Sequence, residues 1–294
     1  MLKNKSKNKS PKLTEAIMKL VFALCGFLAV IFVVLIPGFL AASGIPAISK
    51  IGFVKFIFGT KWASTAAEPS YGILPFILSS LYGTACAVVI GVPIGVFCAV
   101  FLAKMSDGKI SAAVSAAVNL LAGIPSVVYG LIGMIVIVPT VRKVFSLPDG
   151  ANLLSAIVVL SVMILPSVIS VSETAIKAVP REYEEGSLAL GATKTETIFK
   201  ITLPAAKSGI IASAVLGIGR AIGEAMAVMM VSGNVPNMPG LFKSVRFLTT
   251  AVASEMSYAS GLQREALYSV ALVLFIFIMI INLFLNLVVK RKKQ

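Results

Sequence analysis

The chain has 294 residues, of which 58% are hydrophobic and only 13% charged, against about 25% charged residues in an ordinary soluble domain. Its net charge of +14 comes from Lys and Arg that flank long apolar runs, where lipid head groups and topology account for them better than nucleic acid does. The chain has no His and its three Cys lie inside apolar runs, so His-based catalysis is excluded and neither a metal site nor a disulfide framework is expected. Composition therefore predicts an all-α polytopic membrane protein.

Six apolar runs are long enough to cross a bilayer, since a helix needs roughly 20 apolar residues to span the hydrocarbon core. In chain order they cover residues 16–40, 73–103, 110–141, 152–176, 208–231 and 266–289. The second and third runs contain internal Gly and Pro, at Gly91, Pro93, Gly123 and Pro125, where we expect kinks or breaks. The first run is too long for the apolar part of a signal peptide, and we interpret it as a retained span.

Six spans place both termini on one side of the membrane, and the basic residues indicate which side. The terminal side carries 17 Lys and Arg and the opposite side 8. Because excess Lys and Arg marks the cytoplasm, both termini are predicted to be cytoplasmic. The basic stretch 1–12 and the basic tail 288–294 would then lie in the cytoplasm.

Two segments between spans are predicted on the opposite side. Residues 42–72 contain "GFVKFIFGTKW", an amphipathic piece expected in the membrane interface with Trp62 as its anchor. Residues 232–265 form a loop of more than 30 residues, which predicts structure or a task of its own. The chain contains no "GxxxxGK[ST]" phosphate-binding loop, so ATP-driven transport would need another chain to hydrolyse ATP.

The fifth run contains "GIGRAIGEAMAVMMV", residues 217–231, in which two charges interrupt an apolar helix. At 1.5 Å per residue from Ser208, Arg220 lies ~18 Å and Glu224 ~24 Å along the helix, near the bilayer middle. The i,i+4 spacing places both on one helix face. A structural ion pair is one interpretation, but desolvation opposes it. We favour a translocation path in which Arg220 binds an oxyanion and Glu224 holds Arg220 ready and keeps binding weak.

Further polar side chains occur in the third and fourth runs. They are Asn119, Ser126, Tyr129, Ser167, Ser170 and Glu173. Such groups in membrane helices more often join helices than bind ligands, so none is chosen as a substrate contact. Glu173 is expected to snorkel or to pair with Lys177 four residues on.

Residues 178–210, between the fourth and fifth runs, predict a helix–turn–helix. The first helix should begin after Pro180, because the acidic residues that follow favour a helix amino terminus. A turn at "LGAT" follows, and a second short helix starts near Thr193, where "TKTE" offers a capping box to Glu196. We expect this helix to stop at Pro204. Such a unit would project from the membrane as a compact knob.

The knob carries a spaced motif. It reads Glu185-Gly186-Ser187, three residues, Gly191, nine residues, then Ile201-x-Leu203-Pro204. This resembles the "EAA" loop of ABC-importer permeases, Glu-Ala-Ala, three residues, Gly, nine residues, Ile-x-Leu-Pro. In that family the loop is the coupling helix that seats in a groove of the ATP-binding subunit.

The resemblance implies a role for each motif residue. Gly191 would supply the tight turn, since Gly permits positive φ. Ile201 and Leu203 would pack the knob, Pro204 would end it, and Glu185 could offer a charge to the ATPase. Gly186 and Ser187 replace the two alanines with other small residues, although Gly186 adds helix-breaking character.

Three stretches, 121–134, 166–193 and 219–234, are together similar to the PstC-type permease family of bacterial phosphate importers, over roughly residues 73–287. The family commonly has Glu-Thr where Glu224 is followed here by Ala225. The resemblance implies a type I ABC importer permease fold. It divides the chain into 1–72 (basic amino terminus, first span and interfacial segment), a five-helix permease domain 73–287 and the tail 288–294.

The same resemblance implies a transport subunit, not an enzyme, in the bacterial plasma membrane. It would form half of an alternating-access pathway for inorganic phosphate. Its expected partners are a second, PstA-type permease, a dimer of ATP-binding subunits and an extracytoplasmic phosphate-binding protein, besides membrane lipid. ATP and Mg would be used by the partner ATPase, with no cofactor bound by this chain. Alternatives are a permease for molybdate or sulfate, and an ion-coupled secondary transporter, which would leave the loop spacing unexplained.

Overall fold

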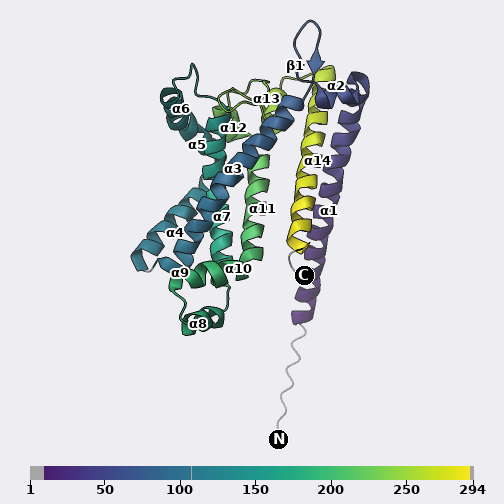
Figure 1. Ribbon diagram of the computed structural model, residues 1–294. Helices are drawn as coiled ribbons and strands as arrows, with labels where there is room; N and C mark the ends of the chain where they lie inside the picture. Colours follow the sequence, from purple (N-terminus) through teal and green to yellow (C-terminus); the bar gives the residue numbers. More distant parts are fainter. Residues whose placement is uncertain (1–9, 107, 292–294) are drawn as a thin grey trace.

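The computed structural model describes residues 10–106 and 108–291, so most of the predicted basic stretch 1–12 and the end of the tail 288–294 lie outside the described residues. The described chain is helical almost throughout (Figure 1). The apolar runs form α1 (Ser10–Ile51), α3 (Leu74–Val100), α4 (Gly108–Gly123), α5 (Ser126–Ile132), α6 (Val138–Val144), α7 (Leu153–Lys177), α11 (Lys207–Gly223), α12 (Met226–Val231) and α14 (Gly261–Arg291).

Shorter elements connect these helices. They are α2 (Phe53–Phe58), α8 (Arg181–Ala189), α9 (Lys194–Thr197), α10 (Leu203–Ala205), α13 (Leu248–Glu255), the strands β1 (Trp62–Ala63) and β2 (Ser70–Tyr71), and the π-helical turns η1 (Phe101–Met105), η2 (Gly133–Ile137) and η3 (Ile198–Thr202). The strands pair antiparallel, Trp62 opposite Tyr71.

The span count agrees with the sequence. Among the described residues, five helices are long and apolar enough to cross a membrane, and up to six if α11 and the segment Lys194–Ala205, which are bent by 69°, are one span. The start of α1, the end of α14 and α8 lie at one end of the molecule, here called the terminal end, while α2, β1 and α13 lie at the other, the distal end (Figure 1). This arrangement is the one expected for an even number of spans.

Kinks or breaks were predicted at Gly and Pro in two runs; a break is confirmed in one run, and the other contains no break. Span three breaks between α4 and α5 at Gly123–Pro125, so the predicted run 110–141 is two helices. Span two, in contrast, continues through Gly91 and Pro93 as one helix. A Cβ at Gly91 would lie 2.7 Å from the Ile164 side chain of α7, so this glycine allows α3 and α7 to approach each other closely.

The core forms around α7, which packs along α3 and α11. Leu160, Met163, Ile164 and Val168 of α7 are at most 1% exposed. A second apolar cluster at the distal end joins the β1–β2 hairpin to α3, α13 and α14. Trp62 lies in that cluster, 5% exposed and edge-on to Tyr71, so the expectation that it anchors the chain in the membrane interface is wrong. The indole ring of Trp62 instead packs against another aromatic ring inside the protein.

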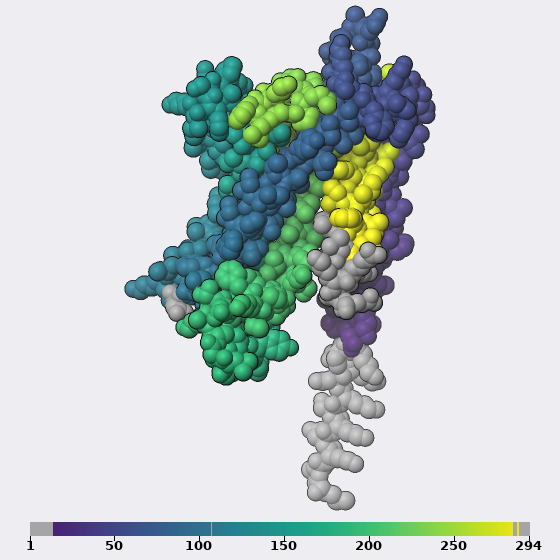
Figure 2. All heavy atoms as spheres, viewed as in Figure 1, coloured from purple at the N-terminus to yellow at the C-terminus, as the bar shows by residue number. Residues whose placement is uncertain are grey.

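The helix α1 stands at one edge of the molecule and packs on α14 (Figures 1 and 2). The close approach occurs at Gly44, where a Cβ would lie 2.8 Å from the backbone nitrogen of Ser269. The Ser269 hydroxyl donates to the Gly44 carbonyl at 2.6 Å. A small residue and one interhelical hydrogen bond thus fix the two helices together, as is common between membrane helices.

Candidate functional site

The predicted fifth span is broken at the charged residues. The helix α11 ends at Gly223, Glu224 is extended with φ −73° and ψ 127°, and α12 begins at Met226. Arg220 and Glu224 therefore do not share one helix face, and the predicted i,i+4 geometry is wrong. Two hydrogen bonds explain the break: the Glu224 carboxylate accepts from the Ala227 N–H at 2.9 Å, and the Glu224 carbonyl accepts from the Thr249 hydroxyl at 2.7 Å. Such side-chain bonds replace the helical ladder.

Arg220 projects towards two other spans. Its side chain is half-buried, and its Nη1 donates to the Ser167 hydroxyl of α7 at 3.2 Å. Tyr129 of α5 is a further buried polar residue of span three. That tyrosine is 6% exposed and donates to the Leu121 carbonyl at 2.7 Å, across the break in span three. Within the described residues no carboxylate forms an ion pair with Arg220.

The broken spans three and five pack directly on each other. A Cβ at Gly130 of α5 would lie 2.8 Å from the Ala227 Cα of α12. At Gly133, a Cβ would meet Val231 of α12 and Val159 of α7 at 2.7 Å. The two discontinuous spans and α7 therefore form one unit beside Arg220. Discontinuous helices at membrane depth occur where backbone is buried in protein or lines a water-filled path.

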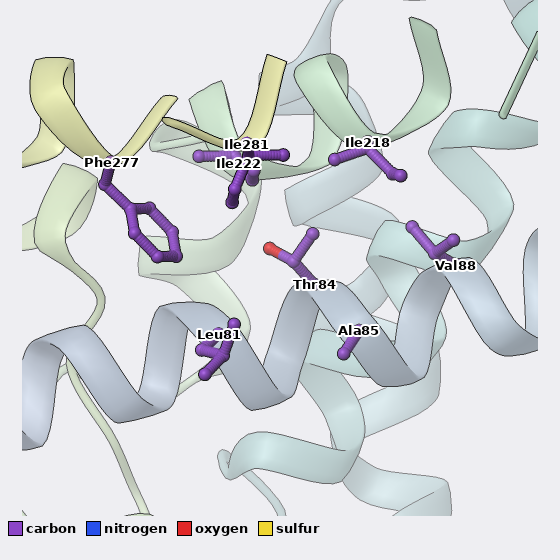
Figure 3. A pocket seen from close by; sticks show the side chains of 8 residues that line it. All are labelled: Leu81, Thr84, Ala85, Val88, Ile218, Ile222, Phe277 and Ile281. Atoms are coloured by element: carbon purple, nitrogen blue, oxygen red, sulfur yellow. The ribbon is translucent and has the colours of Figure 1, made fainter. Parts of the chain in front are cut away.

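The face of α11 that lies opposite Arg220 lines an apolar groove. A groove of about 160 Å³ lies between α3, α11 and α14, and apart from Thr84 its lining is apolar (Figure 3). Ile218 and Ile222 of α11 point into it. Arg220 is two residues from each, about 200° around the helix at 3.6 residues per turn. The guanidinium thus belongs to the face that carries polar groups, and this groove offers no charge to an anion.

The knob has the predicted local structure. The helix α8 begins directly after Pro180, and Gly191 has φ +88°, the left-handed conformation that closes its end. The capping box is confirmed: the Thr193 hydroxyl accepts from the Glu196 N–H at 3.2 Å, and the Glu196 carboxylate accepts from the Thr193 N–H at 3.0 Å. These bonds from Thr193, followed by Lys200, lower the pKa of Glu196. The capping box is therefore complete above the ordinary carboxyl pKa and is lost as pH falls through the lowered one.

The motif residues of the knob divide into exposed and packed groups. Glu185 and Gly186 are exposed, and a Cβ at Gly186 would meet nothing within 4 Å. Ile201 is half-buried, and Leu203 packs against the cluster that joins the knob to α3 and α7. The helical stretch that starts after Thr193 ends at Ala205, one residue beyond Pro204, so the predicted end is confirmed to within one residue.

The partly buried polar contacts of Ser187 and Glu184 in the knob were not predicted. The Ser187 hydroxyl lies 2.9 Å from the Thr197 hydroxyl, so serine adds a contact that alanine would lack. Glu184 forms an ion pair with Lys104 of η1 at 2.6 Å and accepts from the Thr202 hydroxyl at 3.0 Å. The side chains of Lys104 and Glu184 are 17% and 21% exposed. No sequence pattern links positions 104 and 184, because their contact depends on how span two meets the knob.

A sequence profile described as "Binding-protein-dependent transport system inner membrane component" matches residues 91–294. The chain belongs to this family. It is 35% identical to a probable ABC transporter permease protein, YqgH, of Bacillus subtilis, over 94% of this chain and 93% of that protein. It is 32% identical to the phosphate transport system permease protein PstC of Pasteurella multocida, with the same coverage of each chain.

Solved structures give the fold of this permease. A chain of the inward-facing MetNI methionine ABC transporter aligns with a TM-score of 0.60 at 23% identity, over 74% of the permease and 95% of that chain. A chain of a bacterial alginate ABC transporter aligns with a TM-score of 0.65 at 17% identity, over 96% and 98%. The predicted type I ABC importer permease fold is confirmed. The protein is thus a multi-pass membrane permease subunit, and the alternative of an ion-coupled secondary transporter is set aside.

The permease exposes several large apolar side chains on its knob. They are Tyr183 (58% exposed), Leu188 (43%), Leu190 (90%) and Phe199 (50%). The knob projects beyond the helical body at the terminal end (Figure 2). Exposed large apolar side chains on a projecting segment are consistent with a protein–protein contact.

Proposed function

We propose that this permease forms half of the translocation pathway of an ATP-driven phosphate importer, with Arg220 as its anion-binding residue. The observation that carries the proposal is the half-buried Arg220 guanidinium, held by Ser167 and without a carboxylate partner in the described part of the chain. An ionisable residue inside a membrane span is costly to bury and marks a candidate functional site by default. A planar guanidinium matches phosphate oxygens.

The broken helix changes the role proposed for Glu224. Its carboxylate accepts from the Ala227 N–H, so it shapes the turn before α12 and leaves Arg220 unneutralised. A negative charge four residues on in the chain would still weaken anion binding, which favours release. The relatives named phosphate transport system permease protein PstC, including that of Haemophilus influenzae at 31% identity, support phosphate as the anion.

The proposal includes orientation and partners. The excess of Lys and Arg at the terminal end supports a cytoplasmic position for both termini and the knob. There the exposed apolar side chains of the knob, with Glu185, would dock on one of two ATP-binding subunits, which use ATP and Mg. A second, PstA-type permease would complete the pathway, and an extracytoplasmic phosphate-binding protein would deliver substrate to the distal end. This chain itself would bind no cofactor.

The test is uptake of labelled phosphate at low external phosphate, in cells that lack this chain and are complemented at matched expression. The native chain should restore uptake. Arg220→Gln should lower uptake at least about tenfold, since a charge-assisted contact contributes roughly 1.5–3 kcal/mol. Arg142→Gln is the matched control, because Arg142 is exposed in α6 and should behave as native.

Two results would contradict the proposal. Normal uptake by Arg220→Gln would show that Arg220 has no role in the translocation pathway. Failure of the native chain to restore phosphate uptake, with its partner subunits present, would show that phosphate is not the substrate. Uptake of labelled molybdate or sulfate by the same cells would then identify the oxyanion.

A further inference from the structure

The short helix α13 is buried at its beginning and polar at its end. Leu248, Thr250 and Ala251 are fully buried, and Thr249 is 8% exposed. The Phe247 ring, directly before the helix, fills the space beside Gly83 of α3, where a Cβ would lie 2.6 Å from the ring. The first turn of α13 is therefore seated in the helical body rather than on its surface.

The buried end of α13 reaches the break in span five. The Thr249 hydroxyl donates to the Glu224 carbonyl at 2.7 Å, and the Leu248 N–H donates to the Ser80 hydroxyl of α3 at 3.0 Å. Glu224 lies outside both α11 and α12, so its carbonyl is not held in a regular helix. A backbone carbonyl at membrane depth requires a donor within the protein. Thr249 supplies that donor and so helps to fix the turn beside Arg220.

The other end of α13 is the centre of a polar cluster at the distal end. The Glu255 carboxylate accepts from the Trp62 indole at 3.2 and 3.3 Å and from the Gln263 amide at 3.0 Å, and it forms an ion pair with Arg246. Glu255 and Arg246 are 19% and 14% exposed. One carboxylate therefore ties α13 to the β1–β2 hairpin, the loop before α13 and the start of α14.

From these contacts we infer that α13 couples the distal face of the permease to the break in span five, with Thr249 as the positioning residue for Glu224. A partner that shifts the hairpin or the loop moves Glu255, and a rigid eight-residue helix carries that shift to the Glu224 carbonyl. The turn that holds Arg220 in place then responds to the state of the distal face. The use of this coupling in transport rests on the proposed function, whereas the coupling itself is a property of this chain.

The experiment measures hydrogen exchange in peptides that cover residues 221–231, in the purified permease with its partner subunits. Thr249→Val keeps the shape but removes the hydroxyl, and should speed exchange of the turn about fivefold, as expected for losing one hydrogen bond. Thr249→Ser keeps the hydroxyl and should exchange as native. Glu255→Gln, at the far end of α13, should speed exchange of the same peptides. The Thr249→Val and Glu255→Gln effects should be non-additive, because both act through one helix.

Matched controls separate coupling from general loss of stability. Glu265→Gln removes a carboxylate that pairs with Lys50 at 2.9 Å, also at the distal end, and should leave residues 221–231 unchanged. Thr174→Val removes an exposed hydroxyl that is hydrogen-bonded within α7, and it should also leave hydrogen exchange of residues 221–231 unchanged. If Thr249→Val does not assemble, Thr249→Ala removes the same hydroxyl with a residue that favours helix.

Unchanged exchange at 221–231 in the Thr249 variants or in Glu255→Gln would overturn the inference, as would an equal effect of Glu265→Gln. Stimulation of ATP hydrolysis by phosphate-loaded binding protein is measured in the same preparations and should fall about fivefold in Thr249→Val. Native stimulation in that variant would overturn the role of Thr249 in transport. If native protein shows no phosphate-dependent stimulation, the proposed substrate fails, while the exchange data still decide whether α13 couples the two regions.

Discussion

At the scale of single residues, two glycines of the knob should respond in opposite ways to replacement by alanine. Gly191 adopts φ +88°, where an L side chain costs about 1–2 kcal/mol. Gly186 lies within α8 with open space around it, and alanine there should stabilise the helix by roughly 0.5–1 kcal/mol. We predict that Gly191→Ala lowers the thermal unfolding midpoint of the purified permease and reduces co-purification of the ATP-binding subunit. Gly186→Ala should raise the midpoint and preserve co-purification. Similar shifts of one sign in both variants would contradict this assignment.

The same scale shows what local sequence can predict. The turn at Gly191 and the capping box between Thr193 and Glu196 involve neighbours in the chain, so residue types and spacing were sufficient. Arg220 was identified from its charge in an apolar run, but its contact was not. Ser167 is 53 positions away, and the helix break that separates Arg220 from Glu224 depends partly on a hydroxyl donated by Thr249. Such contacts follow from tertiary packing and leave no periodic signal.

At the scale of elements, the knob is fastened to span two by the Lys104–Glu184 ion pair. The pair is largely shielded, so breaking it should cost between the ~1 kcal/mol of an exposed pair and the roughly 3–5 kcal/mol of a buried one. We predict that Lys104→Glu and Glu184→Lys each reduce phosphate uptake relative to ATP hydrolysis in proteoliposomes. The double exchange should recover most of the loss, because it restores the pair with reversed charges.

A matched charge reversal tests whether the location of this pair matters. Lys200→Glu breaks the Lys200–Glu196 pair, whose side chains are 73% and 47% exposed, and should change the ratio of uptake to hydrolysis little. A loss in Lys200→Glu equal to that in Lys104→Glu would show that net charge on the knob, not its attachment to span two, controls coupling. Failure of the double exchange to recover would have the same meaning.

The sequence predicted which membrane spans exist, but it did not predict reliably which spans are continuous helices and which are broken. Long apolar runs specify spans because hydrocarbon requires about 20 apolar residues, and that constraint acts locally. A glycine in an apolar run does not by itself specify a break. Gly91 packs against Ile164 and α3 stays helical there, whereas span three breaks between Gly123 and Ser126. Sequence alone offered the same signal at both positions.

At the scale of the whole molecule, the two ends can be distinguished by two highly exposed side chains. Leu190 on the knob is 90% exposed, and Tyr258, which follows α13 at the distal end, is 89% exposed. The knob must face the cytoplasm if the basic residues set the orientation. A polar, membrane-impermeant thiol reagent applied to intact cells should therefore label Tyr258→Cys and leave Leu190→Cys unlabelled. In inverted vesicles the pattern should reverse.

The native chain is the background control, since Cys25, Cys86 and Cys98 lie in apolar membrane helices, where a charged reagent has little access. Labelling of Leu190→Cys from outside intact cells would show the opposite orientation in the membrane. The knob would then lie outside the cell, where no cytoplasmic ATPase could bind it. That outcome would remove the coupling role of the motif from Glu185 to Pro204, even though its local structure formed as predicted. The expected pattern instead places Thr249, Glu255 and the hairpin on the side from which substrate arrives.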